Sequence, residues 1–451
     1  MPRDFSPDPL VDYYCWDGQS ELGVYGGKHL NCTQHPWAEC GFPFYGAGPL
    51  PPSEMWLGPT NPVRRKFYLY GDFRSALANN TNVANAETVW ANRLNLDFDY
   101  AITATERFHM FWGPIDEGQQ FNGLQINSGD LDVDAHADFW DPNTDTMFFE
   151  GDLGAMLGGW GGHFSNFDLP FAVGLIPLVL QNGIWLNDAF VGAAATIPAR
   201  NSPLRDWSNF DTTFFVGVDQ LNTRAFGGAK DTAFVGATTF IERRGGYIEL
   251  GWAFLDDPDN LGRQYHNLSA SYTRRYLNLV SNSARVIVNA GQGGPSNQRT
   301  ADGVLLLLEN SLLTPLPYNL IPYCNFFAGF NRPQPLGRLT GPLQNTGINF
   351  ETDFLTGYPT LDDSANDTYG AALGVDLLGR QFDKQLIVEG AFVQTRGDGV
   401  GRIAPGDQYG VGTRYQKRLT HNLLFRADAM HGWLDNSRDV SGARVELRHK
   451  F

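Results

Sequence analysis

Apolar and polar residues alternate at a period of two in many strand-length segments of this chain. The clearest example is segment 90–102, where one face would hold Leu94, Leu96, Phe98, Tyr100 and Ile102. The other face would hold Arg93, Asn95, Asp97 and Asp99. Successive side chains of a β-strand point to opposite faces. Such a polar face is typical of a strand that meets lipid on one side and water on the other.

The same alternation recurs along nearly the whole of residues 63–451. We expect further strands at 66–74, 107–112, 247–254, 267–275, 284–290, 369–377, 385–394, 409–418, 423–433 and 440–451. Short turns at 104–106, 379–383 and 419–422 alternate with longer polar links at 114–129, 256–262, 292–303, 334–349 and 395–406. This rhythm is typical of the periplasmic turns and extracellular loops of an outer-membrane barrel.

The length of this region predicts the size of the barrel. At roughly 20 residues for each strand and its share of the connections, it holds about 18 strands, with 16 as the alternative, because bacterial barrels use even numbers. The chain is 13% aromatic and only 18% charged, which fits a lipid-facing band with aromatic girdles. No segment approaches the ~20 apolar residues that a membrane helix needs. The sequence therefore predicts an all-β, antiparallel, up-and-down transmembrane barrel, since only helices and closed barrels span membranes.

Residues 1–62 differ from the rest and predict an irregular arm that precedes the barrel. This segment holds three cysteines and a cluster of prolines: Pro43, Pro49, Pro51, Pro52, Pro59 and Pro62. Proline cannot donate to a sheet ladder, which excludes a central strand there. The arm would plug the barrel mouth, cap the periplasmic end, bind a periplasmic or surface protein or an electron carrier, or form a partly ordered tail. Residues 1–10 lack the features of a secretory signal peptide, and we expect that such a peptide has been removed.

The four cysteines are Cys15, Cys32, Cys40 and Cys324. Exported compartments are oxidising, so we expect at least one disulfide within the first 40 residues. Four cysteines allow three complete pairings, and the sequence does not choose among them. Zinc binding by Cys15, Cys32, His35 and Cys40 is disfavoured because their spacing matches no common zinc pattern. No haem-attachment motif is present, and no cofactor is predicted.

The charged residues suggest a polar lumen. The net charge of −16 argues against a nucleic-acid partner. The acids either favour cations in the lumen or lie in solvated loops. We expect the lumen to be lined by Asp72, Arg74, Arg93, Asn95, Asp97, Asp99, Arg107, Glu249, Arg275, Arg285, Arg414, Arg426, Arg444, Glu446 and Arg448. Arginines attract anions and carboxylates attract cations, so the charge selectivity stays open.

Catalytic and metal-binding motifs are weak. No G-x-S-x-G motif occurs, and His109, His136 and His163 lack a nucleophile motif, so each is interpreted as a lumen or loop residue. The sequence therefore predicts that the protein is not an enzyme. Segment 131–140 places Asp132, Asp134, His136 and Asp138 on one face. These oxygens are weak candidates for a divalent cation site, and a polar lumen strand is the favoured interpretation.

Two segments resemble known barrels. The last strand alternates around Arg444, Glu446 and Arg448 and ends on Phe451, which resembles the C-terminal assembly signal of bacterial outer-membrane proteins. Segment 175–190, LIPLVLQNGIWLNDAF, and the last 45 or so residues are similar to the alginate-export type of large outer-membrane barrel. That resemblance implies a monomeric barrel of about 18 strands with a charged lumen.

The sequence as a whole predicts a bacterial outer-membrane porin that lets small hydrophilic solutes or ions diffuse passively. Its expected surroundings are outer-membrane lipid and lipopolysaccharide. The alternatives are a scaffold barrel whose arm binds a protein partner, or an exporter of a polymer. If the barrel closes, Arg444, Glu446 and Arg448 should lie beside Tyr70, Asp72 and Arg74 of the first strand.

Overall fold

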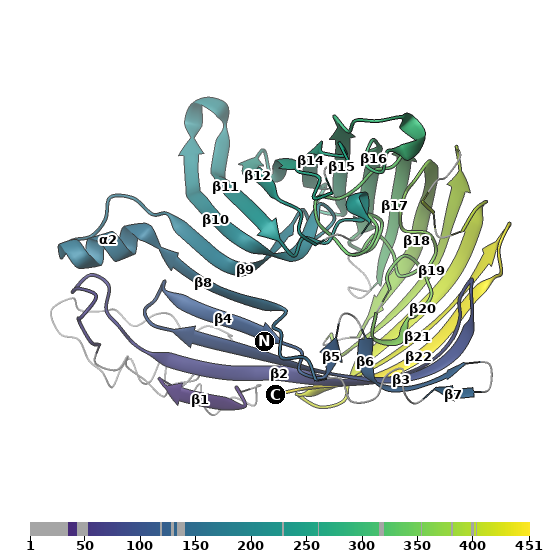
Figure 1. The fold of residues 1–451 in the computed structure, drawn as a ribbon, viewed down its shortest axis with the longest axis horizontal. Helices are drawn as coiled ribbons and strands as arrows, with labels where there is room; N and C mark the ends of the chain where they lie inside the picture. Colours follow the sequence, from purple (N-terminus) through teal and green to yellow (C-terminus); the bar gives the residue numbers. More distant parts are fainter. Residues whose placement is uncertain are drawn as a thin grey trace.

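A computed structural model describes residues 35–42, 53–117, 120–127, 130–132, 140–227, 230–259, 261–314, 320–352, 354–379, 382–397, 401–402 and 404–451. Eighteen antiparallel strands close into a ring (Figure 1). The ring closes where Asp72 to Thr81 of the first strand pair with Lys450 to Ser441 of the last. This confirms the predicted barrel of 18 strands and the predicted contact between its first and last strands.

The ring strands follow the chain in order, and each pairs with its neighbours in sequence. They are β2 (Lys66–Thr81), β3 (Ala86–Ala101), β4 (Arg107–Trp112), β8 (Thr146–Asp152), β9 (Pro170–Leu180), β10 (Leu186–Ser202), β11 (Trp207–Asp219), β12 (Phe234–Arg243), β13 (Gly246–Leu255), β14 (Tyr265–Tyr276), β15 (Val280–Ala290), β16 (Val304–Leu312), β17 (Leu320–Phe330), β18 (Thr368–Leu378), β19 (Lys384–Thr395), β20 (Gln408–Arg418), β21 (Leu423–Leu434) and β22 (Val440–Lys450).

Several elements lie outside the ring. β1 (Ala38–Gly41) pairs with the start of β2 and extends the sheet beyond the end of β22. The connection between β4 and β8 was expected to hold a polar link at 114–129 and a polar lumen strand at 131–140. Its described residues contain β5 (Asp116–Glu117), β6 (Gln120–Asn127) and β7 (Asp130–Asp132). β6 pairs with the first half of β3, beyond the end of the short β4. The helical elements are α2 (Leu153–Gly161), η2 (Pro203–Arg205), η3 (Arg224–Phe226), η4 (Ser296–Gln298) and η5 (Phe354–Thr356).

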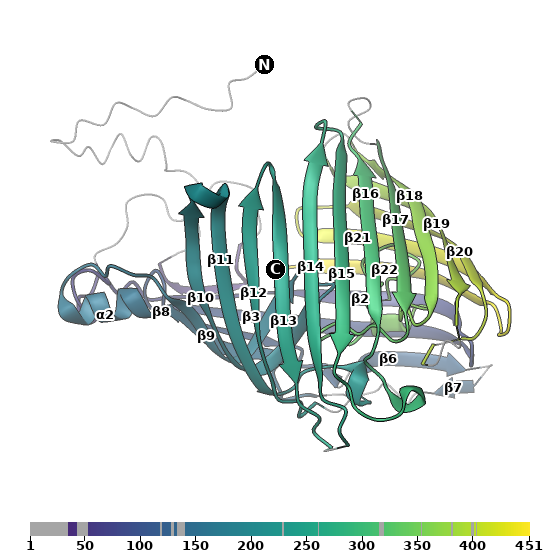
Figure 2. The ribbon, with the colours of Figure 1, turned by 90° about the horizontal axis from the view of Figure 1, so that it is seen from above.

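The barrel has two unlike ends. Figure 2 shows β10 to β17 side by side, with their short hairpin turns at the upper edge. The turns at 203–206, 244–245 and 277–279 define what we call the turn end, where β2 begins and the chain terminates. Arg244 and Gly245 both have positive φ, the conformation that tight hairpins favour. The described residues of the connections at 256–264, 291–303, 331–367 and 396–407 lie at the opposite, loop end.

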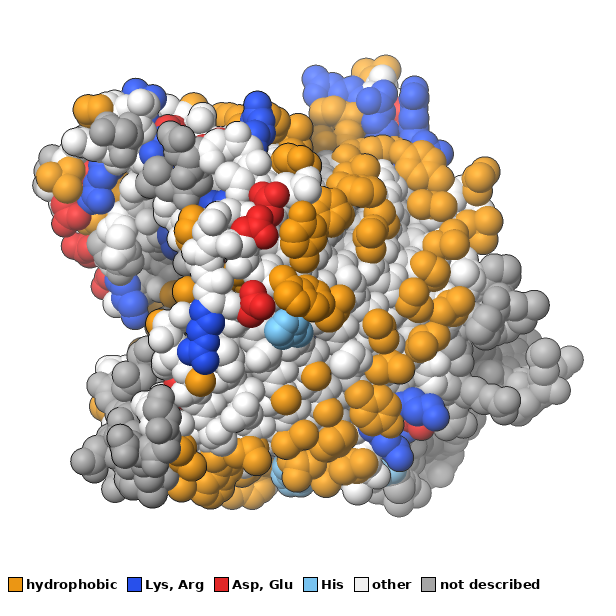
Figure 3. Space-filling view, turned by 90° about the vertical axis from the view of Figure 1, so that its right-hand side faces the viewer, with side chains coloured by type: hydrophobic (Ala, Val, Ile, Leu, Met, Phe, Trp, Pro, Cys, Tyr) orange, Lys and Arg blue, Asp and Glu red, His pale blue; other side chains and the backbone are white. Residues whose placement is uncertain are grey.

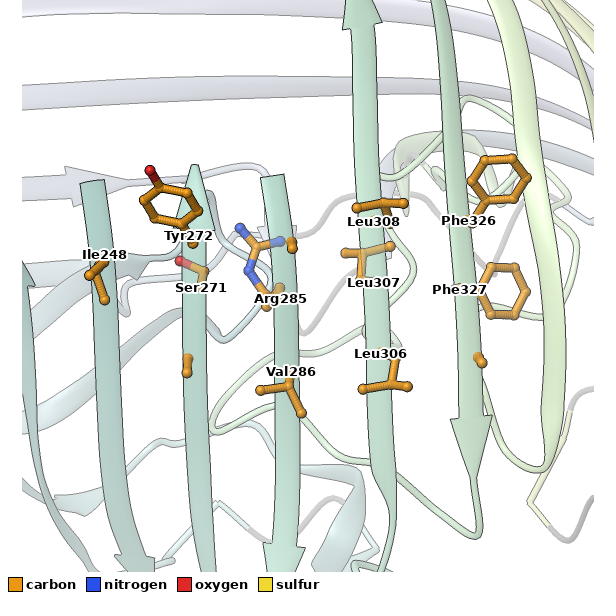
Figure 4. Close-up of a pocket in the computed structure, with 13 residues that line it drawn as sticks. Ile248, Ser271, Tyr272, Arg285, Val286, Leu306, Leu307, Leu308, Phe326 and Phe327 are labelled. Atoms are coloured by element: carbon orange, nitrogen blue, oxygen red, sulfur yellow. The ribbon is translucent and has the colours of Figure 1, made fainter. Parts of the chain in front are cut away.

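The outer face of the wall is apolar. Trp252, Leu306, Phe326, Leu373 and Leu447 are each 41% to 47% exposed and project from the ring. Hydrophobic side chains dominate the face seen in Figure 3. A shallow depression of about 660 Å³ on β13 to β17 lies over small residues such as Ala270 and Ala284 (Figure 4). A continuous apolar belt of this kind would be unfavourable in water. No helix within the described residues is long and apolar enough to cross a membrane.

The inner face is not polar throughout, which differs from the expected lumen. Along β13 to β16 the inward positions include Ala253, Leu255, Ile287 and Leu305, all fully buried. They belong to an apolar core with Trp185, Phe190, Leu336 and Phe350. Residues 304–308, VLLLL, show the reason: Leu305 and Leu307 pack in this core, whereas Leu306 and Leu308 belong to the apolar outer face, so the strand is apolar on both faces. Part of the barrel interior is therefore filled by a packed hydrophobic core.

Candidate functional site

The charged half of the inner face begins with a cluster around Asp428 of β21. The Nε atoms of Arg414, on β20, and Arg426 donate to the Asp428 carboxylate at 2.7 and 2.8 Å. Arg444 of β22 donates to the same carboxylate at 3.1 Å. One aspartate thus holds three guanidinium groups, and the strand pairing brings them together because all four positions face inward.

The cluster continues across the seam that closes the barrel. Glu446 accepts a bidentate pair of hydrogen bonds from Arg74 of β2, both at 2.9 Å. Asp72 accepts a second bidentate pair from Arg448 at 2.7 and 3.1 Å, and Asn95 of β3 donates to Asp72. Bidentate arginine–carboxylate pairs are rigid and directional. We call the inward polar residues of β20–β22, β2–β4 and β8 the charged wall.

The part of the charged wall on β3, β4 and β8 is richer in acids. His109 lies 3.1 Å from Glu150 of β8 and 4.0 Å from Asp99 of β3. Tyr70 donates a hydrogen bond to Asp99. Arg107 lies 4.0 Å from Glu150. These groups adjoin the arginine-rich strands, so opposite charges lie side by side along one half of the ring.

Arg93 joins the charged wall to the loop end. Its Nε lies 3.1 Å from Asp116 of β5, and its Nη2 lies 3.7 Å from Asp145. Its guanidinium also lies over the ring of Phe121, 5.4 Å from the ring centre. Burial raises the pKa of Asp116 to about 6, against the lowering effect of Arg93, and the nearby Asp145 and Asp141 add to the rise.

The pKa of Asp116 predicts a pH-dependent selectivity. As the pH falls through about 6, Asp116 becomes neutral and Arg93 loses part of its compensation, so the selectivity should shift toward anions. The reversal potential in a salt gradient, compared between about pH 7.5 and about pH 4.5, measures this change. Asp116→Asn should lack that step, and a step of equal size in this variant would contradict the assignment.

The same shift carries a stability effect of known sign. The folded state binds the Asp116 proton more tightly than the unfolded chain does, since the ordinary pKa is 3.8. This group therefore favours folding at low pH, and that contribution is lost as the pH rises from about 4 to about 6.

Residues 331–367, the connection between β17 and β18, fold into the barrel, and we call them the lumen loop. Glu389 of β19 anchors this loop. Its carboxylate accepts hydrogen bonds from the backbone N–H groups of Ile348 and Asn349, both at 2.9 Å, and from the Asn349 side chain at 2.8 Å. Tyr323 of β17 donates to it as well. Four donors satisfy this buried carboxylate, and three of them come from the lumen loop.

The lumen loop also contacts the charged wall. Glu351 accepts a 2.6 Å hydrogen bond from Arg414, and the Tyr358 ring lies 5.5 Å from the guanidinium of Arg444. The side chain of Asn80, on β2, donates to the carbonyl of Thr356. Glycine permits this close approach, because a Cβ at Gly442 would lie 2.8 Å from Pro359.

Earlier residues of the lumen loop reach a different part of the ring. The N–H groups of Leu336 and Arg338 donate to the carbonyls of Trp185 and Asn222, and Asn187 donates to the carbonyl of Gly337. Trp185 and Asn222 lie in the β9–β10 and β11–β12 connections, and Asn187 lies at the start of β10. The lumen loop therefore crosses the interior from β10 to the charged wall.

A second connection, residues 181–185, packs inward beneath the lumen loop. Gln181 donates to Ser269 and Trp185 donates to Asn267, both inward residues of β14. Trp185 is fully buried. Together the two segments fill the apolar half of the barrel, so solvent reaches the interior mainly at the charged wall. There the side chains of Arg93, Arg107 and Glu150 remain 25%, 35% and 40% exposed.

The structure places most residues expected to line the lumen on the charged wall. Those residues are Asp72, Arg74, Arg93, Asn95, Asp97, Asp99, Arg107, Arg414, Arg426, Arg444, Glu446 and Arg448. The other three lie elsewhere. Glu249 bonds Ser271, and Arg285 is buried against Glu309, both away from that wall. Arg275 is exposed beside a hairpin turn.

The cysteines, the candidate metal ligands and His163 were also singled out in the sequence. Cys40 in β1 and Cys324 on the outer face of β17 are free thiols, whereas Cys15 and Cys32 lie outside the described residues. The same is true of Asp134, His136, Asp138 and the side chain of Asp132. No group of metal-binding side chains occurs among the residues that are described. His163 is exposed just after α2.

Sequence reasoning missed Asp428, Glu389, Glu351 and Tyr358. Asp428 alternates with Arg426 in a predicted strand, so its inward position could have been inferred. Glu389 is a single acid in a mostly apolar strand, and this is a weaker signal. Nothing local marks Glu351 or Tyr358, because their roles depend on where the lumen loop folds.

Comparison with known proteins supports the fold. No family model and no curated protein matches the sequence. Among solved structures, OccK5 (OpdH) of Pseudomonas aeruginosa matches with a TM-score of 0.55 and 12% identity, over 85% of this chain and 98% of the other. OccK11 (OpdR) of the same organism matches with a TM-score of 0.55 and 12% identity, over 85% and 96% of the two chains.

OpdK of Pseudomonas aeruginosa, crystallised with vanillate, has a TM-score of 0.56 at 11% identity, over 85% of this chain and 98% of the other. At such identities the likeness is one of fold. The resemblance to alginate-export-type barrels finds no support in these comparisons. What remains of it is the barrel of 18 strands with charged side chains on its inner face.

Proposed function

We propose that this protein is a bacterial outer-membrane porin through which small hydrophilic solutes diffuse passively. The observation that carries the proposal is the charged wall, which lies inside a closed barrel with an apolar outer belt. A ring of 18 strands is wide enough for an aqueous channel, and here the lumen loop narrows it. Solutes would pass between the lumen loop and the inward side chains of β2, β3, β4 and β8.

The apolar belt also supports a location in the outer membrane, with lipid against the belt and lipopolysaccharide around the loop end. Barrels are one of two architectures that satisfy every backbone group within a bilayer. The arm of residues 1–62 would then precede the barrel of residues 63–451 as a separate functional unit. Strand β1 of the arm pairs with the start of β2, which supports a role in extending the sheet at the turn end of the barrel.

Planar-bilayer recording of the purified, folded protein tests this proposal. We expect stepwise currents of uniform size that do not depend on an added energy source, because the path is a preformed pore. The same recording on a variant lacking residues 1–62 tests whether the arm obstructs the path. A folded barrel that shows no ion-permeable state in either form would contradict the proposal.

Solute uptake into liposomes separates a porin from a scaffold barrel. Liposomes that contain the protein should swell in small sugars or amino acids at a rate that falls as solute size increases. Swelling no faster than that of protein-free liposomes, together with a stoichiometric partner that is lost on removal of residues 1–62, would favour the scaffold function instead.

A further inference from the structure

The turn end of the barrel exposes apolar side chains at the tips of its hairpins. Leu204, between β10 and β11, is fully exposed, Leu277 between β14 and β15 is 89% exposed, and Phe382 between β18 and β19 is 73% exposed. Turns in water usually carry Gly, Asn, Asp or Ser at such positions. The three tips are spread around the ring, so a single partner that contacts all of them has to extend around the barrel at this end.

Helix α2 adds a larger apolar surface to the same end. Asp152 caps its first turn, and its buried glycines, among them Gly154 and Gly158, pack backbone against backbone on residues 163–167. Leu153, Leu157 and Trp160 share the opposite face, and Trp160 is 65% exposed. Phe164, just after the helix, is 82% exposed. The helix contains no charged residue.

This surface is continuous with the outer belt. Figure 1 shows α2 at the ends of β8 and β9 and projecting away from the interior. Val173, near the start of β9, and Met147, at the far end of β8 from the helix, both face outward and are 47% and 45% exposed. The apolar face of α2 therefore adjoins the part of the wall that faces lipid under the proposed function.

The turn end is also basic, although the whole chain carries a net charge of −16. Its exposed cations include Arg205, Arg244, Arg275, Lys384, Lys417 and Arg418, and Arg244 lies 3.7 Å from the exposed Asp206. The guanidinium of Arg205 lies 5.0 Å from the ring centre of Trp207. At the loop end, by contrast, the exposed acids include Asp256, Asp259, Asp435 and Asp439. Exposed cations thus lie beside apolar tips at the turn end, whereas the loop end carries exposed acids together with cations such as Lys230 and Arg438.

We propose that this turn-end rim binds the anionic phospholipid headgroups of the adjacent leaflet, with α2 lying in the plane of the membrane interface. The rim consists of the hairpin tips at Leu204, Leu277 and Phe382, helix α2 with Phe164, and the six cations named above. Apolar side chains enter the acyl boundary while the basic ones pair with lipid phosphates. This inference rests on the proposed location in the outer membrane, and it adds that anionic phospholipid is the partner that the rim binds.

Photo-crosslinking tests the contact directly. The full-length protein with Phe164→p-benzoylphenylalanine is reconstituted in bilayers of phosphatidylcholine with phosphatidylglycerol and illuminated. Mass spectrometry should find phospholipid attached to the peptide that contains residue 164. The matched control is the same replacement at Leu261, a 69% exposed loop-end residue, which should gain no lipid. Absence of lipid at 164, or a crosslink there to another protein or a second copy, would overturn the proposal.

A charge-removal variant tests the preference for anionic lipid. Arg205→Ser, Arg244→Ser and Arg418→Ser together remove three rim cations, whereas Lys230→Ser, Arg299→Ser and Arg438→Ser remove three from the loop end. Added phosphatidylglycerol should raise the thermal unfolding temperature of the native protein and of the loop-end variant, and the rim variant should lose most of that rise. An equal rise in all three would overturn the proposal. Their conductance, recorded in parallel, reports on the proposed function separately.

Discussion

Replacing Glu389 by alanine should widen the channel. In the native protein this carboxylate accepts hydrogen bonds from Ile348, Asn349 and Tyr323. Without it, four donors lose their carboxylate acceptor, since Asn349 donates from both its backbone and its side chain, and each unsatisfied buried group costs about 1–3 kcal/mol. The lumen loop should then leave its position against β19. Single-channel conductance should rise several-fold, because the remaining ring of 18 strands encloses a wider lumen.

The control for this change is Asp376→Ala. Asp376 lies on the adjacent strand β18, faces inward and bonds Gln385, not the lumen loop. Its removal deletes the same charge and should leave conductance near the native value. If Glu389→Ala folds and conducts like the native protein, the lumen loop does not limit the path.

Replacing Asp428 by asparagine should make the channel more anion-selective and less stable. The change keeps the side-chain shape but leaves Arg414, Arg426 and Arg444 without their shared counter-charge. Removing one partner of a buried ion pair typically costs about 3–5 kcal/mol. We expect unfolding at a lower urea concentration and a reversal potential in a salt gradient that shifts toward the anion.

Asp435→Asn is the matched control, because Asp435 is an exposed acid just beyond the end of the same strand. It should change neither stability nor selectivity by a comparable amount. Adding Arg426→Gln to Asp428→Asn should restore part of the stability and reverse part of the shift in selectivity, since one uncompensated cation is then removed. If the double variant has the same stability and the same reversal potential as Asp428→Asn, the effect does not come from the cluster around Asp428.

The alternation of apolar and polar residues predicted the barrel well because each strand of the charged wall has one polar and one apolar face. Segment 90–102, which forms the end of β3, and segment 440–451, which forms β22, show this directly. The pairing of β22 with the first ring strand, β2, also followed from the sequence, since a closed ring must join its first strand to its last. The periodic signal is strong wherever water and lipid meet opposite faces.

The apolar half of the interior could not be predicted in the same way. Residues 304–308 are apolar at every position, because one face packs in the core and the other lies on the apolar outer belt, and such a run has no period of two that would identify a strand. What covers the inner face is the lumen loop and residues 181–185, which come from distant parts of the chain. Glu389 gains its role only through contact with Asn349, 40 residues away.

The central claim is that solutes pass along the charged wall and not through the apolar half of the barrel. Single-channel recording with a charged methanethiosulfonate reagent tests it on Arg93→Cys, from the middle of β3, and on Ala253→Cys, from the apolar core. The reagent should reduce the current through Arg93→Cys and leave Ala253→Cys and the native protein unchanged. Block through Ala253→Cys, or no block when mass spectrometry shows residue 93 to be modified, would contradict the account.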